Sequence, residues 1–106
     1  MNIEDTYKKQ FPSNTQEAIR TDFLHSVLFT NDPLVKVAST LVTEELNTVC
    51  PWSGLPDFAA LQIEYTPSEK LVEMKSLKYY LTSFRTVGIT MEAATRRICR
   101  DLGTLL

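Results

Sequence analysis

Hydrophobic and polar positions alternate most regularly near the middle of the chain, between Ala59 and Tyr65. An alternation with a period of two places one set of side chains on each face of an extended strand. The apolar face carries Leu61, Ile63 and Tyr65, and the polar face carries Gln62 and Glu64. This pattern predicts a half-buried antiparallel strand.

A run rich in β-branched residues, Leu34–Thr40, follows the turn signal at residues 31–33 and predicts another strand. This strand is expected to end near Glu44 and Glu45. A two-stranded sheet has two unpaired edges and is only marginally stable in water. We therefore expect the sheet to be extended by further strands or by neighbouring subunits.

Toward the end of the chain, apolar residues recur every three or four positions, as one face of a helix requires. The first series predicts a helix that ends at Gly88: Met74, Leu77, Leu81 and Phe84. The second series, after Thr90 as a candidate N-cap, is Met91, Ala94, Ile98, Leu102 and Leu105. Strands followed by helices predict an α+β fold in which two helices cover one face of an antiparallel sheet.

The first thirty residues show no sustained period and predict an N-terminal lead segment, with the domain proper over residues 31–106. The lead segment contains one apolar cluster, which we expect to pack on the domain or on a neighbour: Phe23, Leu24, Val27, Leu28 and Phe29. His25 lies within this cluster, and we interpret it as a structural histidine rather than a catalytic one.

Length and composition narrow the class of protein. A chain of 106 residues makes at most one domain, and a formal net charge of −2 argues against direct binding to nucleic acid or to an acidic membrane. No apolar run is long enough for a signal peptide or a membrane span. Two isolated cysteines and one histidine predict reduced thiols in the cytoplasm and no metal site.

The stretch TVCPWSGLPDFA at residues 48–59 places a thiol, Cys50, in a proline-rich turn. Seven residues later, after the chain has reversed, Asp57 could return close to the sulfur. A thiol beside a carboxyl group suits attack on an electrophilic carbon, such as a nitrile or an imine, with the acid supplying the proton. The alternative is a buried cysteine that only packs within a turn.

Three charged residues further along also have two interpretations. Lys75 and Lys78 near the start of the first helix are either a solvated face or cations that meet a phosphate. Glu92 either complements the dipole of the second helix or accepts hydrogen bonds from a guanine-like edge.

Together, these motifs resemble a known family. CPWSGLPDFA, then VEMKSLKYYLTSFR starting 22 residues after the cysteine, then GITMEAA with its glutamate 42 residues after it, are similar to the 7-cyano-7-deazaguanine reductases of queuosine biosynthesis. The resemblance runs from about Val35 to Leu106. It implies the tunnelling fold, in which subunits of two strands, two helices and two more strands form a barrel with active sites at subunit boundaries.

The resemblance also implies roles for individual residues. Cys50 would add to the substrate nitrile to form a thioimide, and Asp57 would give a proton to the nitrile nitrogen. The residues implied for binding the 7-deazapurine are Val72, Glu73, Met74, Met91 and Glu92. Those implied for binding NADPH are Met74, Lys75, Ser76 and Lys78. The implied partners are this small molecule and further copies of the chain.

Two departures from the family pattern keep alternatives open. Met91 stands where many family members have histidine, and the sequence ends before the second strand pair and its Arg-Gly-Gly segment. The fold expected here therefore lacks the C-terminal strand pair. One alternative is the related amidinotransferase that acts on deazaguanine in archaeal transfer RNA, although the segment Lys75–Lys78 favours the reductase. Another is a non-catalytic deazapurine-binding or assembly subunit.

Overall fold

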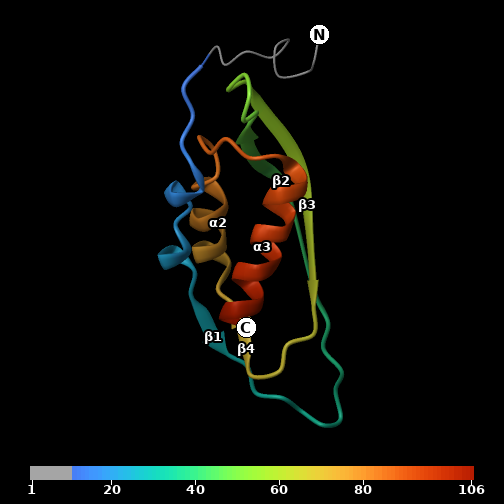
Figure 1. The fold of residues 1–106 in the computed structure, drawn as a ribbon. Helices are drawn as coiled ribbons and strands as arrows, with labels where there is room; N and C mark the ends of the chain where they lie inside the picture. The colour runs from blue at the N-terminus through green and yellow to red at the C-terminus, as the bar shows by residue number, and fades with distance from the viewer. Residues whose placement is uncertain (1–10) are drawn as a thin grey trace.

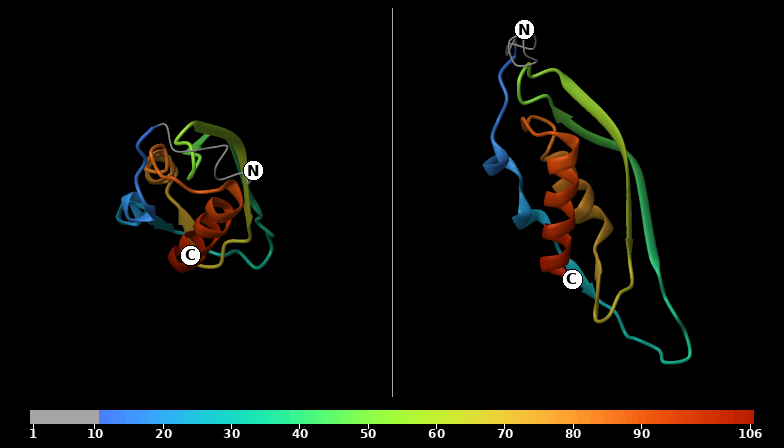
Figure 2. Two further views of the ribbon diagram at one scale, coloured as in Figure 1. Left: turned by 45° about the horizontal axis from the view of Figure 1, so that its top comes forward. Right: turned by 45° about the vertical axis from the view of Figure 1, so that its right-hand side comes forward.

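A computed structural model describes residues 11–106 and shows an elongated α+β body (Figure 1). In chain order its elements are η1 (Gln16–Ala18), η2 (Thr21–Phe23), β1 (Ser26–Leu28), β2 (Ser39–Val49), β3 (Pro56–Tyr65), β4 (Lys70–Val72), α2 (Met74–Thr82) and α3 (Met91–Leu105). Both helices lie on the same side of the long β2–β3 hairpin (Figure 2). The predicted α+β class is confirmed, and the arrangement is consistent with the tunnelling fold.

The β2–β3 hairpin pairs antiparallel, from Ser39 opposite Tyr65 to Val49 opposite Pro56. The alternation predicted for β3 is confirmed, because Leu61 is buried against the helices while its neighbour Gln62 is exposed. The helix-facing side of the hairpin joins the core, whose buried members also come from the lead segment and both helices: Ile19, Leu24, Leu46, Leu61, Val72, Leu77, Tyr80, Leu81, Phe84, Val87, Ile89, Ala94, Ile98 and Leu102.

A β-bulge interrupts the hairpin. Thr43 pairs with Leu61 and Leu46 pairs with Ala59, so the two residues Glu44 and Glu45 of β2 stand opposite a single residue of β3. The extra residue exchanges the two faces of β2. Before the bulge the odd-numbered residues face the helices, and after it the even-numbered residues do so.

The strand predicted over Leu34–Thr40 is wrong at both ends, because β2 starts at Ser39 and continues to Val49. The β-branched composition misled the prediction. Residues 34–38 lie beyond the end of β3 and have no pairing partner within the described chain, and Leu34 is 92% exposed. Strand propensity is effective only where a neighbouring strand and a buried face exist. The two glutamates do not end the strand, since the bulge accommodates them.

Helix α2 starts at Met74, where the carboxylate of Glu73 caps it by accepting from the backbone N–H of Lys75 at 3.0 Å and of Ser76 at 2.7 Å. It ends at Thr82, so the predicted end at Gly88 is wrong. Phe84 and Val87 continue the apolar pattern because both are buried, but residues 83–88 form a turn rather than a helix.

Helix α3 begins as predicted. The Thr90 hydroxyl accepts a hydrogen bond of 3.2 Å from the backbone N–H of Ala93, which confirms this residue as the N-cap. Tyr80 on α2 donates its hydroxyl to Asp101 on α3 at 2.6 Å, and Asp101 also accepts from Arg97 at 2.8 Å. This partly buried network joins the two helices.

The lead segment packs against the same core as the rest of the described chain. Ile19 and Leu24 are buried members of that core, and β1 pairs antiparallel with β4 from Ser26 opposite Val72. Only part of the apolar cluster packs as expected: Leu24 is buried, whereas Leu28 on the outer side of β1 is 90% exposed. The division at residue 30 stays a prediction about domain organisation.

Two kinds of feature are absent from residues 11–106. No helix there has the length and apolar character needed to cross a membrane. No group of three or more His, Cys, Asp and Glu side chains in that range is arranged to hold a metal ion. The expectation of a metal-free protein stays a prediction.

Candidate active site

The turn at the end of the hairpin holds Cys50 in place through backbone hydrogen bonds. The N–H of Cys50 donates to the carbonyl of Leu55 at 2.8 Å, and the N–H of Gly54 donates back to the carbonyl of Cys50 at 2.8 Å. Gly54 has a φ of 80°, a conformation that residues with a side chain rarely adopt. The thiol therefore lies on a closed turn, half-buried at the end of β2.

Local contacts lower the pKa of the Cys50 thiol. Burial acts in the opposite direction and raises this pKa, as does the negative charge of Asp57. Hydrogen bonds from the side chain and backbone of Ser53 and from the backbone of Trp52 outweigh both effects. The Ser53 N–H lies 3.5 Å from the sulfur. A thiol of this kind gives a reactive thiolate more readily than an ordinary cysteine.

Asp57 lies on the same face of the hairpin as Cys50. It pairs with Thr48 across the two strands, and side chains of a cross-strand pair share a face. The thiol of Cys50, two residues further along, returns to that face. The negative charge of Asp57 acts on the thiol and raises its pKa, as expected for a carboxylate close to the sulfur.

The start of α3 is brought to the same end of the molecule. The turn before it runs beside β2, with the Val49 N–H donating to Val87 at 3.0 Å and the Ile89 N–H donating to Val49 at 3.1 Å. Figure 1 shows this connection next to the hairpin turn. The hydrogen bond between Ile89 and Val49, the neighbour of Cys50, thus lies two residues before Met91 and three before Glu92. Met91 is half-buried and Glu92 is exposed.

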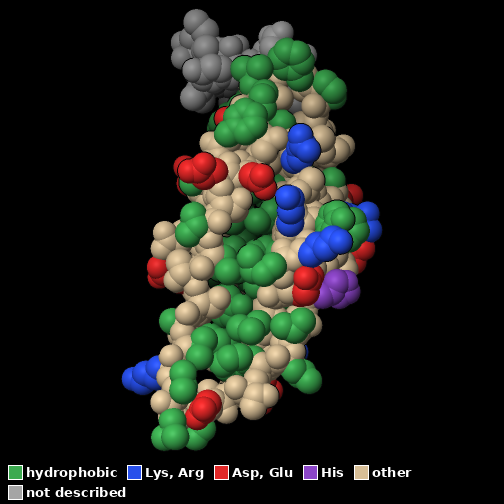
Figure 3. Space-filling model, turned by 180° about the vertical axis from the view of Figure 1, so that it is seen from behind, with side chains coloured by type: hydrophobic (Ala, Val, Ile, Leu, Met, Phe, Trp, Pro, Cys, Tyr) green, Lys and Arg blue, Asp and Glu red, His purple; other side chains and the backbone are tan. Residues whose placement is uncertain are grey.

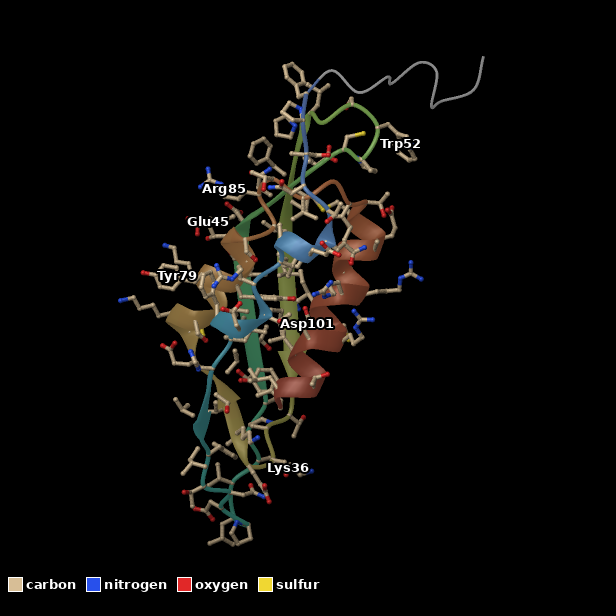
Figure 4. The ribbon with its side chains drawn as sticks, turned by 60° about the vertical axis from the view of Figure 1, so that its left-hand side comes forward. Lys36, Glu45, Trp52, Tyr79, Arg85 and Asp101 are labelled. Carbon is tan, nitrogen blue, oxygen red and sulfur yellow. The ribbon has the colours of Figure 1, made fainter. Side chains whose placement is uncertain are left out.

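The start of α2 lies at the other end of that helix. The C-terminal end of α2 leads into the turn beside Val49, so Glu73 is one helix length further from Cys50, about 13 Å for nine residues. Figure 4 shows Trp52 of the hairpin turn at one end of the molecule and Tyr79 of α2 well removed from it. One chain therefore does not bring Glu73 to Cys50.

A groove runs between β2 and α2. Its walls include Leu41, Val42, Thr43, Glu45, Ile63, Met74, Leu77, Lys78, Leu81 and Thr82. Figure 3 shows hydrophobic side chains along the middle of this face, with a cluster of lysine and arginine side chains on one flank and acidic side chains on both flanks. Lys75 and Lys78 are exposed, and neither forms an ion pair with another described residue. This surface offers an apolar wall beside unpaired cations.

Beside the groove, the start of α2 anchors the lead segment. The Ser76 hydroxyl accepts from the His25 N–H at 3.0 Å and donates to the Glu73 carbonyl at 2.7 Å. The N–H groups of Ser76 and Lys75 lower the pKa of the Glu73 carboxyl by hydrogen bonding to its ionised form, although burial slightly opposes this. The same residues line a shallow pocket with Phe23, His25 and Tyr79. His25 contributes backbone hydrogen bonds here and is itself exposed, so its interpretation as a structural histidine stays a prediction.

Comparisons with known proteins identify the family. A family model described as QueF-like protein matches residues 56–106. The NADPH-dependent 7-cyano-7-deazaguanine reductase of Caldicellulosiruptor bescii is 47% identical over 105 residues, which cover 98% of this chain and 79% of the relative. The chain belongs to the 7-cyano-7-deazaguanine reductase family. Proteins of the same name from Thermoanaerobacter pseudethanolicus and Thermotoga petrophila are 48% and 50% identical, covering 98% and 91% of this chain and 78% and 69% of the relatives.

For this reductase family member, the residues predicted from sequence fall into two groups. Cys50 and Asp57 lie together, with the start of α3 beside them, whereas the segment from Val72 to Lys78 runs from the end of β4 into the first half of α2. Val72 is buried within β4, Met74 is exposed in the groove, and the Ser76 hydroxyl is occupied by backbone groups. The roles of all these residues stay predictions. The relatives' names do not favour the amidinotransferase or the non-catalytic subunit.

Sequence reasoning on the reductase chain missed two residues that shape the turn. Ser53 contacts the sulfur, and a serine three residues after a cysteine in a turn was the available signal. Phe11 lies in the lead segment, and its N–H donates to the carbonyl of Ser53 at 3.1 Å. No sequence pattern indicated that contact, because 42 residues separate the two partners.

Gly54→Ala is expected to destabilise the reductase chain by at least about 2 kcal/mol, because alanine is strained at positive φ. The added Cβ would also lie 2.9 Å from the carbonyl carbon of Phe11 and closer still to its oxygen. Gly103→Ala is the matched control, since its Cβ would meet nothing within 4 Å and it lies inside α3. Urea unfolding should show the control gaining about 0.5–1 kcal/mol. Equal effects at both glycines would contradict this account of the turn.

Proposed function

We propose that this chain reduces the nitrile of 7-cyano-7-deazaguanine to the aminomethyl group, with NADPH as the reductant, in queuosine biosynthesis. The observation that carries the mechanism is the placement of Cys50 and Asp57 on one face at the end of the hairpin, with the pKa of the thiol lowered. The product of their chemistry is used to modify transfer RNA, and the enzyme itself acts on the free small molecule.

The first step is addition of the Cys50 sulfur to the nitrile carbon. A carbon–sulfur bond forms and one π bond of the nitrile breaks, while Asp57 takes the proton of the Cys50 thiol and delivers it to the nitrile nitrogen. The products are a thioimide and an ionised Asp57. The lowered pKa of the Cys50 thiol supports this step, because it makes the nucleophilic thiolate easier to form.

The groove between β2 and α2, with a volume of about 230 Å³, has room for one ring of a dinucleotide whose remainder lies along the start of α2. Its apolar wall, which includes Met74, suits a flat ring, and the exposed ammonium groups of Lys75 and Lys78 suit phosphates. When bound, NADPH supplies the two hydride equivalents that convert the nitrile carbon to an aminomethyl carbon. We assign Met74, Lys75 and Lys78 to holding it, with Ser76 supporting the start of the helix that carries them.

Glu73 and Glu92 are proposed to recognise the deazapurine. Each carboxylate can accept two or more hydrogen bonds, as the adjacent N–H donors of a guanine-like edge require. The pKa of Glu73 is lowered by its capping contacts, which keeps it ionised and able to accept. Val72 and Met74 beside Glu73, and Met91 beside Glu92, would provide the apolar contacts.

We further propose that each active site is shared between copies of the chain. Three observations support this. Glu73 lies a helix length away from Cys50 within one chain, and β2 and β3 form a sheet of only two strands among the described residues, leaving long edges available for pairing. The outer face of the hairpin is also apolar in places, with Phe58 75% exposed.

We also propose that the chain is cytoplasmic. Its organisation is proposed to be a lead segment followed by a reductase domain over residues 31–106. The support for the location is that Cys50 and Cys99 are both free, as a reducing compartment keeps them. A thiol nucleophile also needs such a compartment to stay reduced.

The proposed function is tested with the purified chain and authentic 7-cyano-7-deazaguanine. Without NADPH, intact-protein mass spectrometry should show a covalent adduct equal to the sum of the two masses. With NADPH, absorbance at 340 nm should fall in proportion to the nitrile consumed. A chain that binds the deazapurine but oxidises no NADPH would instead be a binding or assembly subunit.

A further inference from the structure

Thr48 has a buried hydroxyl with no hydrogen-bond partner. Its side chain is 0% exposed, and Oγ1 contacts no donor or acceptor within residues 11–106. Leaving a buried hydroxyl unsatisfied costs about 1–3 kcal/mol. Most buried polar side chains in native proteins avoid this cost, so an exception needs an explanation.

The position of Thr48 in the hairpin places its side chain beside that of Asp57. Thr48 pairs directly with Asp57 across the hairpin, and Cβ atoms of such a pair lie about 5 Å apart. The bulge at Glu44 and Glu45 is what turns Thr48 toward the helix-facing side, where Asp57 and Cys50 also lie.

The local backbone does not use the Thr48 hydroxyl. On the opposite face, the Asn47 side chain donates to the carbonyls of Thr48 at 2.9 Å and of Asp57 at 3.0 Å. This amide fixes the two strands to each other at the position of the pair. The Thr48 side chain is thus held beside Asp57 without a role in the hairpin's own hydrogen bonding.

We propose that Thr48 is a positioning residue that acts through Asp57, which rests on the proposed role of Asp57 as proton donor. When Asp57 gives its proton to the nitrile nitrogen, the Thr48 hydroxyl rotates and donates a hydrogen bond to the new carboxylate. Thr48 keeps its own proton, and no bond to it breaks. A donor already placed where negative charge develops stabilises the transition state without reorganising the site. Catalytic hydrogen bonds often tighten only in the complex, which accounts for the free hydroxyl here.

The test compares Thr48→Val, which keeps the shape and removes the hydroxyl, with Thr48→Ser, which keeps the hydroxyl. The rate of thioimide formation with 7-cyano-7-deazaguanine is measured in a single turnover, and the melting temperature is measured alongside. Thr48→Val should slow adduct formation about 10- to 100-fold, the range for a hydrogen bond to a charged group. Its melting temperature should be unchanged or higher, because an unsatisfied hydroxyl has been removed. Thr48→Ser should recover most of the rate.

A double-mutant cycle decides whether the effect passes through Asp57. In an Asp57→Asn background, Thr48→Val should cause little further slowing, since the carboxylate it would stabilise is gone. Equal slowing in both backgrounds, a normal rate for Thr48→Val, or a fall in melting temperature that matches the loss of rate would overturn the proposal. Failure of the wild-type chain to form any adduct would overturn the proposed function itself, and the Thr48 role with it.

Discussion

Replacing Cys50 by alanine should abolish both the covalent adduct and NADPH oxidation, with a fall in turnover of at least about 10³-fold. Without the sulfur, no nucleophile adds to the nitrile carbon, and the nitrile nitrogen does not become basic enough to take a proton from Asp57. The adduct is measured by intact-protein mass spectrometry and turnover by absorbance at 340 nm. Binding of the deazapurine, measured by calorimetry, should weaken far less than turnover.

Cys99→Ala is the matched control for this experiment. Cys99 is the other cysteine of the chain, and it is exposed on α3, away from the hairpin turn. The control should keep the adduct and its turnover. An adduct that survives in Cys50→Ala and disappears in Cys99→Ala would show that the nucleophile is Cys99 and that our mechanism is wrong.

Mixing two inactive variants should restore activity if sites are shared between copies. Cys50→Ala lacks the nucleophile, and Glu73→Ser lacks the recognition carboxylate while retaining a side chain that can cap α2. When equal amounts are unfolded together and reassembled, roughly a quarter of the sites should carry both native residues, as expected for a head-to-tail interface. NADPH oxidation measures the recovery, and light scattering confirms that the mixture assembles.

The control mixture pairs Cys50→Ala with Asp57→Asn. Cys50 and Asp57 lie on one face of one hairpin, so every site takes both from the same copy and this mixture should remain inactive. Recovery in neither mixture despite normal assembly would show that Cys50 and Glu73 do not come from different copies. Recovery in both would contradict the placement of Cys50 and Asp57 in one copy.

Much of the fold could be predicted because its signals are local. The alternation around Leu61 identified β3, and Thr90 identified the start of α3 through its own side chain. The errors arose where tertiary contacts decide the outcome. Leu34 lies in a β-branched run without a partner strand, and Phe84 continues a helical pattern while being buried in a turn.

The candidate site was predictable in its chemistry and not in its arrangement. The spacing of Cys50 and Asp57 around a proline-rich turn indicated a thiol beside a carboxyl group, and the hairpin places them on one face. Sequence spacing carries no information on which end of α2 would lie nearer to Cys50. The orphaned Thr48 hydroxyl was likewise hidden, since its burial depends on packing and its orientation depends on the bulge.

The bulge also limits how this hairpin can change in length during evolution. Losing one of Glu44 and Glu45 would turn Val49 toward the helices and turn Thr48 and Cys50 away from them, with every motif residue still present. Insertions or deletions between the bulge and the turn are therefore tolerated only in pairs. Substitutions in the segment between the bulge and the turn do not change which residues face the helices. We therefore expect the number of residues in this segment to stay odd or to stay even among relatives whose sequences there differ.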